Sequence, residues 1–492
     1  MLFIFNLTKI RANVFLLSLA VALLVSPVSV RSQVLEAGLR KQLVPALDAY
    51  SRARHLTSLS FSLFQGDLTW VDYATGYANT RARIKATPAH LYTIASVTKS
   101  ITATTLLHLI SQGKASLNDP VDHFIASFPK NVTLQDLLNH TSGFLREKEN
   151  EKFLTDSDYR EAVRYLPLKF NLKIHRYANY NYAVAGAVIE AITGRPYAQV
   201  ASEYFHAVTG AHLYFRNHPR RHSDPRFVTN YVRKGRRLYE HEVVNFGLWE
   251  PAAFAQTSAK SLAKFLRYHM TTDFIAFLEA HAVPVHKRRK RQPGKRWETY
   301  ALGFRLAYVD DELKYIYHNG FLYGVMATMY YFPDKDLGFV ALTNMSTYPR
   351  QTITLGGLHR HVETAIDRYF NERLVQFTAK NGYIAGVIYF ETHQKEGQAH
   401  ADWIGDAARQ YFQKGNTLAA LHLLKLNNRL FPDVAETYQS LASAYLKTGK
   451  PDLAADTLRK SEFLNSGNVD GPNLKPENDA TQGGAERPES EK

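Results

Sequence analysis

Ser96 and Lys99 are the first pair of residues in the sequence whose types and spacing could do chemistry. They open the run SVTKSITATTLLHLI, a long apolar helical pattern that ends at Gly113. Residues three apart share one face of a helix, so the hydroxyl and the amine can meet. A serine hydroxyl becomes a useful nucleophile when a neighbouring base takes its proton, and a lysine can be that base. Because the helix N-terminus adds free N–H groups and a favourable dipole, the pair predicts a serine nucleophile.

The Ser-x-x-Lys spacing is not specific by itself, because it also occurs at Ser111, Ser127 and Ser261. Ser111 straddles the end of a helical pattern, Ser127 precedes a proline loop, and Ser261 lies in the middle of a predicted helix. Ser96, by contrast, lies where a threonine-rich segment leads into the start of a long apolar helix. We therefore predict Ser96 as the nucleophile and Lys99 as its catalytic neighbour.

The stretch LYTIASVTKSITATTLLHLISQGKASLNDPV, followed by VTLQDLLNHTSGF, closely resembles the serine β-lactamase and penicillin-recognising hydrolase superfamily. It looks most like the class C-type branch, which also holds esterases and D-aminopeptidases. Further blocks follow in the family's order between about residues 45 and 370: HRYANYNYAVAGAVIEAITGRPY, PAAFAQTSAKSLAKFL with Ala252-Ala253 in place of the usual Gly-Gly, YALGFRL, and YHNGFLYGVMATMYYFPDKDLGFVALTN. The resemblance implies an α/β (α+β) fold, with an antiparallel sheet flanked by helices and an all-helical insert. It also implies catalysis through a covalent acyl-enzyme.

The resemblance assigns roles to Tyr177 and Asn179, which match the family's Tyr-x-Asn element. A phenol beside a lysine can serve as a base for Ser96 or donate a proton to the leaving group, so Tyr177 is predicted to be catalytic. The amide of Asn179 can donate and accept hydrogen bonds that hold Lys99 and the substrate amide. The alternative interpretations are a core tyrosine and a turn asparagine, since Tyr-x-Asn occurs twice elsewhere in the chain.

His318-Asn319-Gly320 matches the family's third element, and His318 begins the one His-x-Gly sequence among 20 histidines. A glycine at this point of a strand lets a substrate backbone approach closely. The resemblance places the oxyanion hole at the backbone N–H groups of Ser96 and Phe321. We therefore predict that His318, Gly320 and Phe321 bind substrate together with the asparagine of the Tyr-x-Asn element. The alternative for His318 is a surface histidine at a strand end.

Many β-lactamases carry Lys-Thr-Gly where this chain has the 318–320 triplet. In the resemblance, that lysine and hydroxyl bind the substrate carboxylate, whereas His318 is expected to be neutral over much of the physiological range and Asn319 replaces the hydroxyl. The difference weakens the case for β-lactams and leaves esters, D-amino-acid peptides and peptidoglycan peptides open, because one acyl-enzyme chemistry serves them all. A literal Lys-Thr-Gly occurs at 447–449, but we exclude it because it lies in a predicted turn between helices with no strand after it.

Composition limits the class of protein. The chain has 492 residues, 45% hydrophobic and 21% charged, which excludes a disordered or polytopic membrane protein. It has no cysteine, which excludes disulfides, Cys-ligated zinc, iron–sulfur clusters and cysteine nucleophiles. No cofactor or metal is expected, because His359-x-His361 lacks further ligands at a suitable spacing.

The formal net charge of +15 favours anionic neighbours without choosing among them. Basic segments at 216–226, 233–237 and 287–296 are predicted to be solvated loops with some attraction to an anionic envelope surface. Nucleic acid is not expected as a partner, because no recognition fold is visible and export makes it scarce.

Residues 1–32 are predicted to be a secretory signal peptide. Two basic residues precede an apolar run over 14–25, and a plausible cleavage site lies at 30–32. The run is shorter than the roughly 20 residues that a membrane span needs. Since residues 1–7 are also apolar, an uncleaved membrane anchor is the alternative. We therefore expect an exported protein, either periplasmic or secreted.

The order of the predicted elements indicates one sheet assembled from both ends of the large domain. Strands return late in the chain after a helical insert between about residues 96 and 272. The predicted elements are a helix over 33–54, a hairpin of strands over 56–64 and 68–77 around Gln65-Gly66-Asp67, late strands over 313–318, 325–332 and 338–343, and a closing helix over 358–370.

Five parts are predicted along the chain: a signal peptide (1–32), a β-lactamase-like hydrolase domain (33–372), a connector (373–400), tetratricopeptide-like helical repeats (401–464) and a disordered tail (465–492). The repeats are predicted from matches at an offset of 34 residues, such as Ala408 with Ala442 and Gly415 with Gly449. Two ordinary helical hairpins are the alternative, because about three repeats are usually needed for a stable array.

Together these patterns predict an exported serine hydrolase that acts on an ester, an amide or a D-amino-acid peptide. Its expected partners are a small-molecule or peptide substrate and a protein bound through the repeats. The alternative is a catalytically silent envelope scaffold that uses the repeats. Four intact polar residues at the site argue against the scaffold, because a silent site has no physical need for all of them.

Overall fold

The computed structural model describes residues 37–126, 128, 131–144, 173–215, 224–243, 247–285, 294–348, 355 and 357–466. The chain divides into two compact units, one ending at Ile366 and the other beginning at Asp367. The predicted signal peptide, the predicted tail from residue 467 onward and most of the first and third basic segments lie outside the described residues. None of the described helices has both the length and the apolar character that a membrane span requires.

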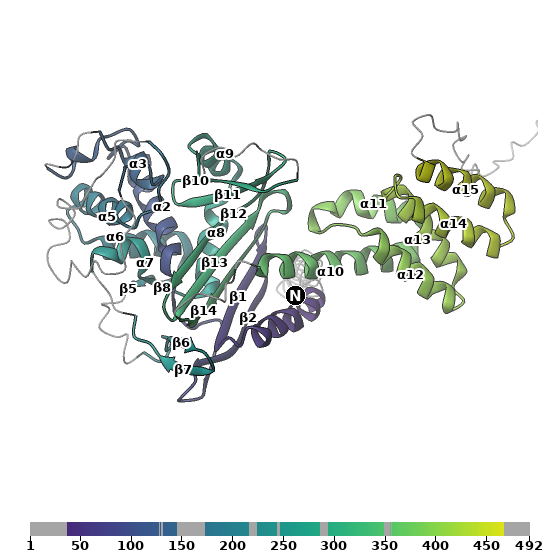
Figure 1. Ribbon diagram of the computed structural model, residues 1–492, viewed down its shortest axis with the longest axis horizontal. Helices are drawn as coiled ribbons and strands as arrows, with labels where there is room; N and C mark the ends of the chain where they lie inside the picture. Colours follow the sequence, from purple (N-terminus) through teal and green to yellow (C-terminus); the bar gives the residue numbers. More distant parts are fainter. Residues whose placement is uncertain are drawn as a thin grey trace, which may run out of the picture. The chain divides into compact units, whose positions relative to one another are not determined.

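The first unit is built on a nine-stranded antiparallel sheet in the order β3-β2-β1-β14-β13-β12-β11-β10-β9 (Figure 1). The predicted hairpin and the predicted late strands therefore share one sheet, joined where β1 pairs with β14. The strands are β1 (Ser58–Gln65), β2 (Leu68–Asn79), β3 (Ile84–Lys85), β9 (Val283–Pro284), β10 (Trp297–Ala301), β11 (Phe304–Val309), β12 (Glu312–Leu322), β13 (Val325–Phe332) and β14 (Leu337–Thr343).

Helices cover both faces of this sheet, which explains why β13 and β14 are buried at every position. On one face α8 (Ala259–His269) packs against β1 and β14. On the other face lie a helix over residues 37–53 and the start of α10 (Leu358–Asn381). His359 stacks on Tyr330 with ring centroids 5.3 Å apart, and His361 meets the edge of Tyr50 at 5.2 Å. Both histidines thus pack against aromatic rings of the sheet and of the first helix.

The helical insert lies between the strands of the sheet in sequence, as predicted. Alongside it are two small three-stranded sheets, and the fold class predicted from the sequence is confirmed. The remaining elements of the unit are β4 (Tyr92–Thr93), α2 (Thr98–Ser111), α3 (Leu134–Leu138), α5 (Tyr180–Thr193), α6 (Tyr197–Thr209), β5 (Tyr214–Phe215), β6 (Tyr231–Lys234), β7 (Arg237–Glu240), α7 (Glu250–Ala253), β8 (Ala255–Thr257), α9 (Thr272–Ala280) and β15 (Met345–Thr347). The basic segment at 233–237 forms the turn between β6 and β7.

The second unit is helical. Its elements after α10 are α11 (Tyr383–His393), α12 (Ala401–Gln413), α13 (Thr417–Leu430), α14 (Ala435–Lys447) and α15 (Pro451–Ser466). Residues 373–400, predicted as a connector, are mostly helical instead, and Leu374 packs in the same hydrophobic cluster as Ile404. The matched pair Ala408 and Ala442 is fully buried in that cluster.

The matched glycines of the second unit lie in its turns. Gly415 and Gly449 both adopt a left-handed conformation, with φ of +77° and +72°, directly after α12 and α14. The literal Lys-Thr-Gly at 447–449 therefore lies at a helix end and in the following turn, as predicted. The two helical hairpins, α12 with α13 and α14 with α15, are compatible with a repeat array. Their identity as tetratricopeptide repeats stays a prediction.

Candidate active site

Ser96 lies in a turn of 3₁₀ helix, Ala95–Val97, that leads directly into α2. The residue before it, Ala95, has φ +46°, a left-handed conformation that residues with a side chain seldom adopt. The Thr98 hydroxyl donates to the Ala95 carbonyl at 2.7 Å and helps to hold this turn. Such strained backbone is commonly found at functional sites, and here it sets a half-buried serine at the N-terminal end of a helix.

Lys99 is fully buried, and its ammonium group has three acceptors around it. Nζ lies 3.2 Å from Ser96 Oγ, 2.6 Å from Asn179 Oδ1 and 2.8 Å from the carbonyl oxygen of Ala252. An ammonium group has three donors and no acceptor, so these three oxygens satisfy it completely. The i,i+3 spacing thus brings Ser96 and Lys99 together, and the Ala252-Ala253 block reaches the site through a backbone carbonyl.

Tyr177 and Asn179 approach the pair from the segment that leads into α5. Asn179 is the N-cap residue of α5, and its side-chain oxygen faces the lysine. The ring centroid of Tyr177 lies 5.0 Å from Lys99 Nζ. The structure therefore brings all four residues of the first two predicted elements, Ser96, Lys99, Tyr177 and Asn179, to one place.

Gly320 brings β12 against the 3₁₀ turn that contains Ser96. A Cβ atom at this position would lie 2.4 Å from the Ile94 carbonyl oxygen and 3.1 Å from the Ser96 nitrogen, so no other residue fits. Pairing of β12 with β11 ends at Tyr317, whereas pairing with β13 continues to Leu322. Among the described residues, no strand therefore pairs with the segment from 318 to 322 on its edge beside Ser96. This position next to the serine nitrogen suits an oxyanion hole formed with the N–H of the following residue, Phe321.

His318 is buried, and both of its ring nitrogens are engaged within the protein. Nδ1 lies 2.9 Å from the Asn319 carbonyl oxygen, so it carries the proton, and Nε2 accepts from the Tyr300 hydroxyl at 3.2 Å. Burial, followed by the nearby charges of Arg305 and Lys99, holds the pKa of His318 well below its usual range. The histidine is therefore neutral, as the sequence indicated. In this arrangement it shapes the site and leaves no ring nitrogen for a substrate.

Asn319 does not take the place of the hydroxyl of Lys-Thr-Gly. It pairs with Thr328 of β13, and the Thr328 hydroxyl donates to Asn319 Oδ1 at 2.5 Å. Successive side chains of a strand point to opposite faces, so Asn319 lies on the other face from His318 and Gly320. The side chain of Asn319 therefore leaves the hydroxyl of Lys-Thr-Gly without a counterpart beside Ser96.

His140, which the sequence analysis missed, fastens the backbone on both sides of Tyr177. Its carbonyl oxygen accepts from the Arg176 N–H at 2.8 Å, and its Nδ1 accepts from the Ala178 N–H at 3.3 Å. The rings of His140 and Tyr177 are 4.3 Å apart. Burial, followed by the nearby His175 and the charges of Lys99 and Arg305, holds the pKa of His140 well below its usual range, so the ring is neutral. The block HTSGF carried this residue, but no local pattern linked it to Tyr177.

Arg305 was also missed, because it lies on β11, outside the recognised triplets. Its guanidinium carbon is 5.8 Å from the centre of the Tyr177 ring and 5.7 Å from that of Tyr300. Its side chain is 23% exposed, and its nearest carboxylate oxygen, on Glu298, is 3.5 Å away. The site therefore has a partly exposed cation that the Lys-Thr-Gly comparison did not reveal. Within the described residues, no group of three or more histidine, aspartate or glutamate side chains could hold a metal ion.

Comparisons with known proteins agree with this geometry. The family model described as Beta-lactamase matches residues 41–360. Protein flp of Staphylococcus aureus (strain MW2) is 24% identical over 321 residues, and the match spans 60% of this chain and 60% of that protein's length.

Solved structures share the fold at low identity. The D-amino acid amidase of Ochrobactrum anthropi SV3, complexed with L-phenylalanine, has a TM-score of 0.55 at 20% identity, over 68% of this chain and 99% of that one. The β-lactamase/D-alanine carboxypeptidase of Pseudomonas syringae has a TM-score of 0.53 at 14% identity, over 66% and 98%. At these identities the likeness supports the fold and leaves the substrate to be argued from the site.

Proposed function

The chain belongs to the Beta-lactamase family, and on that premise we propose that it is an exported serine hydrolase that forms a covalent acyl-enzyme on an ester, an amide or a D-amino-acid peptide. The observation that carries the proposal is the 3.2 Å contact between Ser96 Oγ and the fully buried Nζ of Lys99. Burying a lysine costs free energy unless its charge is well satisfied. A lysine with only a structural role would have no reason to be buried beside the strained turn that contains Ser96.

In the proposed reaction Ser96 Oγ attacks the acyl carbonyl carbon and passes its proton to Tyr177, which acts as the base beside the ammonium group of Lys99. The new Oγ–C bond leaves a negative oxygen, which the N–H groups of Ser96 and Phe321 stabilise. The bond from the carbonyl carbon to the leaving nitrogen or oxygen then breaks, and Tyr177 returns the proton to the leaving group. In the second half of the reaction, water takes the place of the leaving group: it gives a proton to Tyr177 and attacks the acyl carbon, the bond from that carbon to Ser96 Oγ breaks, and Tyr177 returns the proton to Ser96.

The position of Arg305 favours substrates whose leaving group carries a carboxylate. Its planar guanidinium can bind a carboxylate through two parallel hydrogen bonds, a role that the neutral His318 cannot fill. A D-amino-acid peptide with a free C-terminus has such a group, whereas a simple ester does not. The similar proteins from Ochrobactrum and Pseudomonas are named as an amidase and as a carboxypeptidase, which agrees with this preference.

The test is the intact mass of the protein after exposure to a fluorophosphonate probe. We expect a single adduct on the wild-type chain and none on Ser96→Ala or Lys99→Ala. Ser261→Ala, which changes another Ser-x-x-Lys sequence, is the matched control and should still be labelled. A folded wild-type protein without an adduct would contradict the proposal and would favour a silent binding protein.

We further propose that residues 1–32 direct export and that the helical unit binds a protein partner. The signal-like pattern supports the first point, and the buried small residues Ala408 and Ala442 at helix crossings support the second. An envelope location would also place the basic chain beside anionic polymers or lipids. N-terminal mass analysis of the mature protein checks the first point, since cleavage after Ser32 would remove the segment.

A further inference from the structure

Two turns that lie far apart in the sequence put basic side chains together at one end of the first unit. One turn joins β2 to β3, and the other joins β6 to β7. They are tied together because the Thr80 N–H donates to the Tyr231 hydroxyl at 2.8 Å. Figure 1 shows β6 and β7 at the lower end of this unit. The basic side chains in and beside the two turns, which we call the basic end, are Arg81, Arg83, Lys85, Lys234, Arg236 and Arg237.

The charges of the basic end have no partner in the protein around it. All six side chains are exposed, and none forms an ion pair with a carboxylate in the part of the chain that the structure describes. Like charges held this close repel one another, and together they attract an anionic partner.

Carboxylates near the basic end do not cancel its charge. Asp224 is already paired with Arg226 at 2.6 Å. Glu240 is on β7, but successive side chains of a strand alternate between faces, so it lies on the face opposite Tyr239. With Glu242 in the following segment, two acidic residues remain against six basic ones. This end of the unit is therefore positively charged.

Exposed apolar side chains lie among these charges. Ile84, Tyr239 and Tyr348 are 40%, 44% and 43% exposed. The Nζ atom of Lys234 lies 4.6 Å from the centre of the Tyr348 ring and 5.8 Å from that of Tyr239, so the two rings flank the ammonium group. Tyrosines beside basic residues are typical of surfaces that meet the boundary between a membrane and water.

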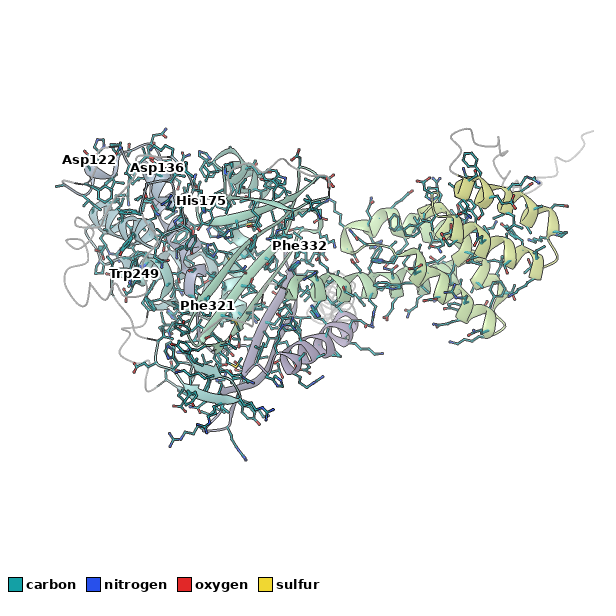
Figure 2. All side chains as sticks on the ribbon, viewed as in Figure 1. Asp122, Asp136, His175, Trp249, Phe321 and Phe332 are labelled. Atoms are coloured by element: carbon teal, nitrogen blue, oxygen red, sulfur yellow. The ribbon has the colours of Figure 1, made fainter. Side chains whose placement is uncertain are left out.

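A row of rings leads from the basic end to β12. The ring of Tyr323 lies 5.2 Å from that of Tyr348 and 5.7 Å from that of Phe321. Figure 2 labels Phe321 in the lower part of this unit, toward β6 and β7. A surface bound at the basic end is therefore close to the end of β12.

We propose that the basic end binds the anionic surface of a lipid bilayer. The six cations contact headgroup phosphates, and Ile84, Tyr239 and Tyr348 enter the interfacial layer. A soluble polyanion would offer phosphates alone, whereas a bilayer also gives the three apolar side chains a place to be buried. This inference concerns where the chain binds and not what it hydrolyses, so its test does not depend on the proposed reaction.

The experiment measures binding of the full chain to two kinds of vesicle, one of phosphatidylcholine alone and one of phosphatidylcholine and phosphatidylglycerol in equal parts. Because the apolar run at 14–25 can insert into both kinds, the readout is the ratio of the two affinities. The wild-type chain should bind the anionic vesicles about a thousandfold more tightly, from about threefold for each cation of the basic end. Added salt should lower the ratio.

Variants of each turn locate the effect. Lys234→Gln, Arg236→Gln and Arg237→Gln combined in one chain should lower the ratio about thirtyfold. Arg81→Gln with Arg83→Gln should lower it about tenfold, because the structure joins this turn to the first. An unchanged urea-unfolding midpoint shows that each variant is folded.

The matched control removes the same net charge elsewhere in the unit. Lys114→Gln, Lys264→Gln and Lys295→Gln change exposed lysines on other segments and should leave the ratio nearly unchanged. Equal binding of the wild-type chain to both kinds of vesicle would overturn the inference, as would an equal loss in the control and in the turn variants.

The tyrosines distinguish a bilayer from a soluble polymer. Tyr239→Ser with Tyr348→Ser should weaken binding to the anionic vesicles about tenfold, because two partly buried rings are lost, and should leave binding to soluble polyphosphate unchanged. Vesicle binding that does not depend on the two tyrosines, together with equally tight binding to polyphosphate, would assign the basic end to an anionic polymer and overturn the proposal.

Discussion

Two glycine-ending triplets of the chain, at 318–320 in β12 and at 447–449 after α14, teach what makes a catalytic element. The second has the letters of the β-lactamase Lys-Thr-Gly, yet Gly449 has open space around it and lies in a turn between helices. Gly320 instead lies against the Ile94 carbonyl and the Ser96 nitrogen. The neighbours in space, and not the letters, determine which triplet serves the nucleophile.

The same contrast holds for the two lysines. Lys99 is fully buried with three oxygen acceptors around its ammonium group. Lys447 is exposed, and its ammonium lies 5.9 Å from the centre of the Phe412 ring. A buried, fully paired charge is expensive to assemble and is typical of functional sites, whereas an exposed one is an ordinary surface group.

The largest expected effect comes from removing each lysine in turn. Lys99→Ala should lower kcat/KM about ten-thousandfold, because the serine and its lysine act as a unit. Lys447→Ala should leave the rate unchanged. Turnover of an activated ester with the purified variants measures both. A rate loss in Lys447→Ala would break the contrast between the two triplets.

The two glycines give the next largest difference. Gly320→Ala should lower the rate about hundredfold, since its Cβ would push β12 away from Ser96 and open the oxyanion hole. Gly449→Ala should instead cost about 1 kcal/mol of unfolding free energy, because its φ of +72° suits glycine, and should spare activity. Rates and urea unfolding of both variants separate the two effects. Full activity in Gly320→Ala would contradict the close contact.

His140 is expected to act by positioning Tyr177 and not by contact with the substrate. His140→Phe keeps a ring against Tyr177 but loses the acceptor for the Ala178 N–H, so kcat should fall about tenfold to hundredfold with little change in KM. The pH profile above pH 7 should keep its shape, because the neutral imidazole carries no titrating charge there. His422→Phe in the helical unit is the control. An unchanged kcat with a raised KM would contradict the positioning role.

The last comparison is a pH dependence of stability that should be stronger in the first unit than in the second. Burial lowers the pKa of His269 to about 4, and those of His140 and His318 also lie below the usual range. Between these values and about 6.5 the unfolded chain binds protons that the folded chain does not, so stability falls as the pH falls. His269 alone should account for about 2 kcal/mol between pH 7 and pH 5.

Urea unfolding at pH 7, 6 and 5 measures this loss. His269→Gln should show a smaller decrease on acidification than the wild-type chain, although it is less stable at pH 7 because Tyr204 loses its 2.7 Å partner. His422→Gln tests the second unit, where the effect should be smaller because that histidine is less buried. Identical pH dependence in wild type and His269→Gln would be inconsistent with a neutral buried imidazole.

Local patterns predicted much of the fold. β13 has the predicted bounds, Val325–Phe332, because a buried run between turn residues leaves little choice. The closing helix was predicted to end at Phe370 but continues to Asn381, since the first residue able to stop it is Gly382 with φ +95°. Residues 373–400 were predicted as a connector because no local pattern showed that their apolar residues, such as Leu374, pack into the cluster of the helical unit.

By itself the sequence predicted the nucleophile, its lysine and the order of the elements that meet them, from the place of Ser96 at the start of a long helix and from the order of the family's sequence blocks. Tertiary structure alone decided which groups complete the site. Arg305 and His140 lie far along the chain from Ser96, Asn319 faces away from it, and His318 is neutral because it is buried between Tyr300 and nearby cations. Burial and charge belong to neighbours in space, and no spacing along a chain records them.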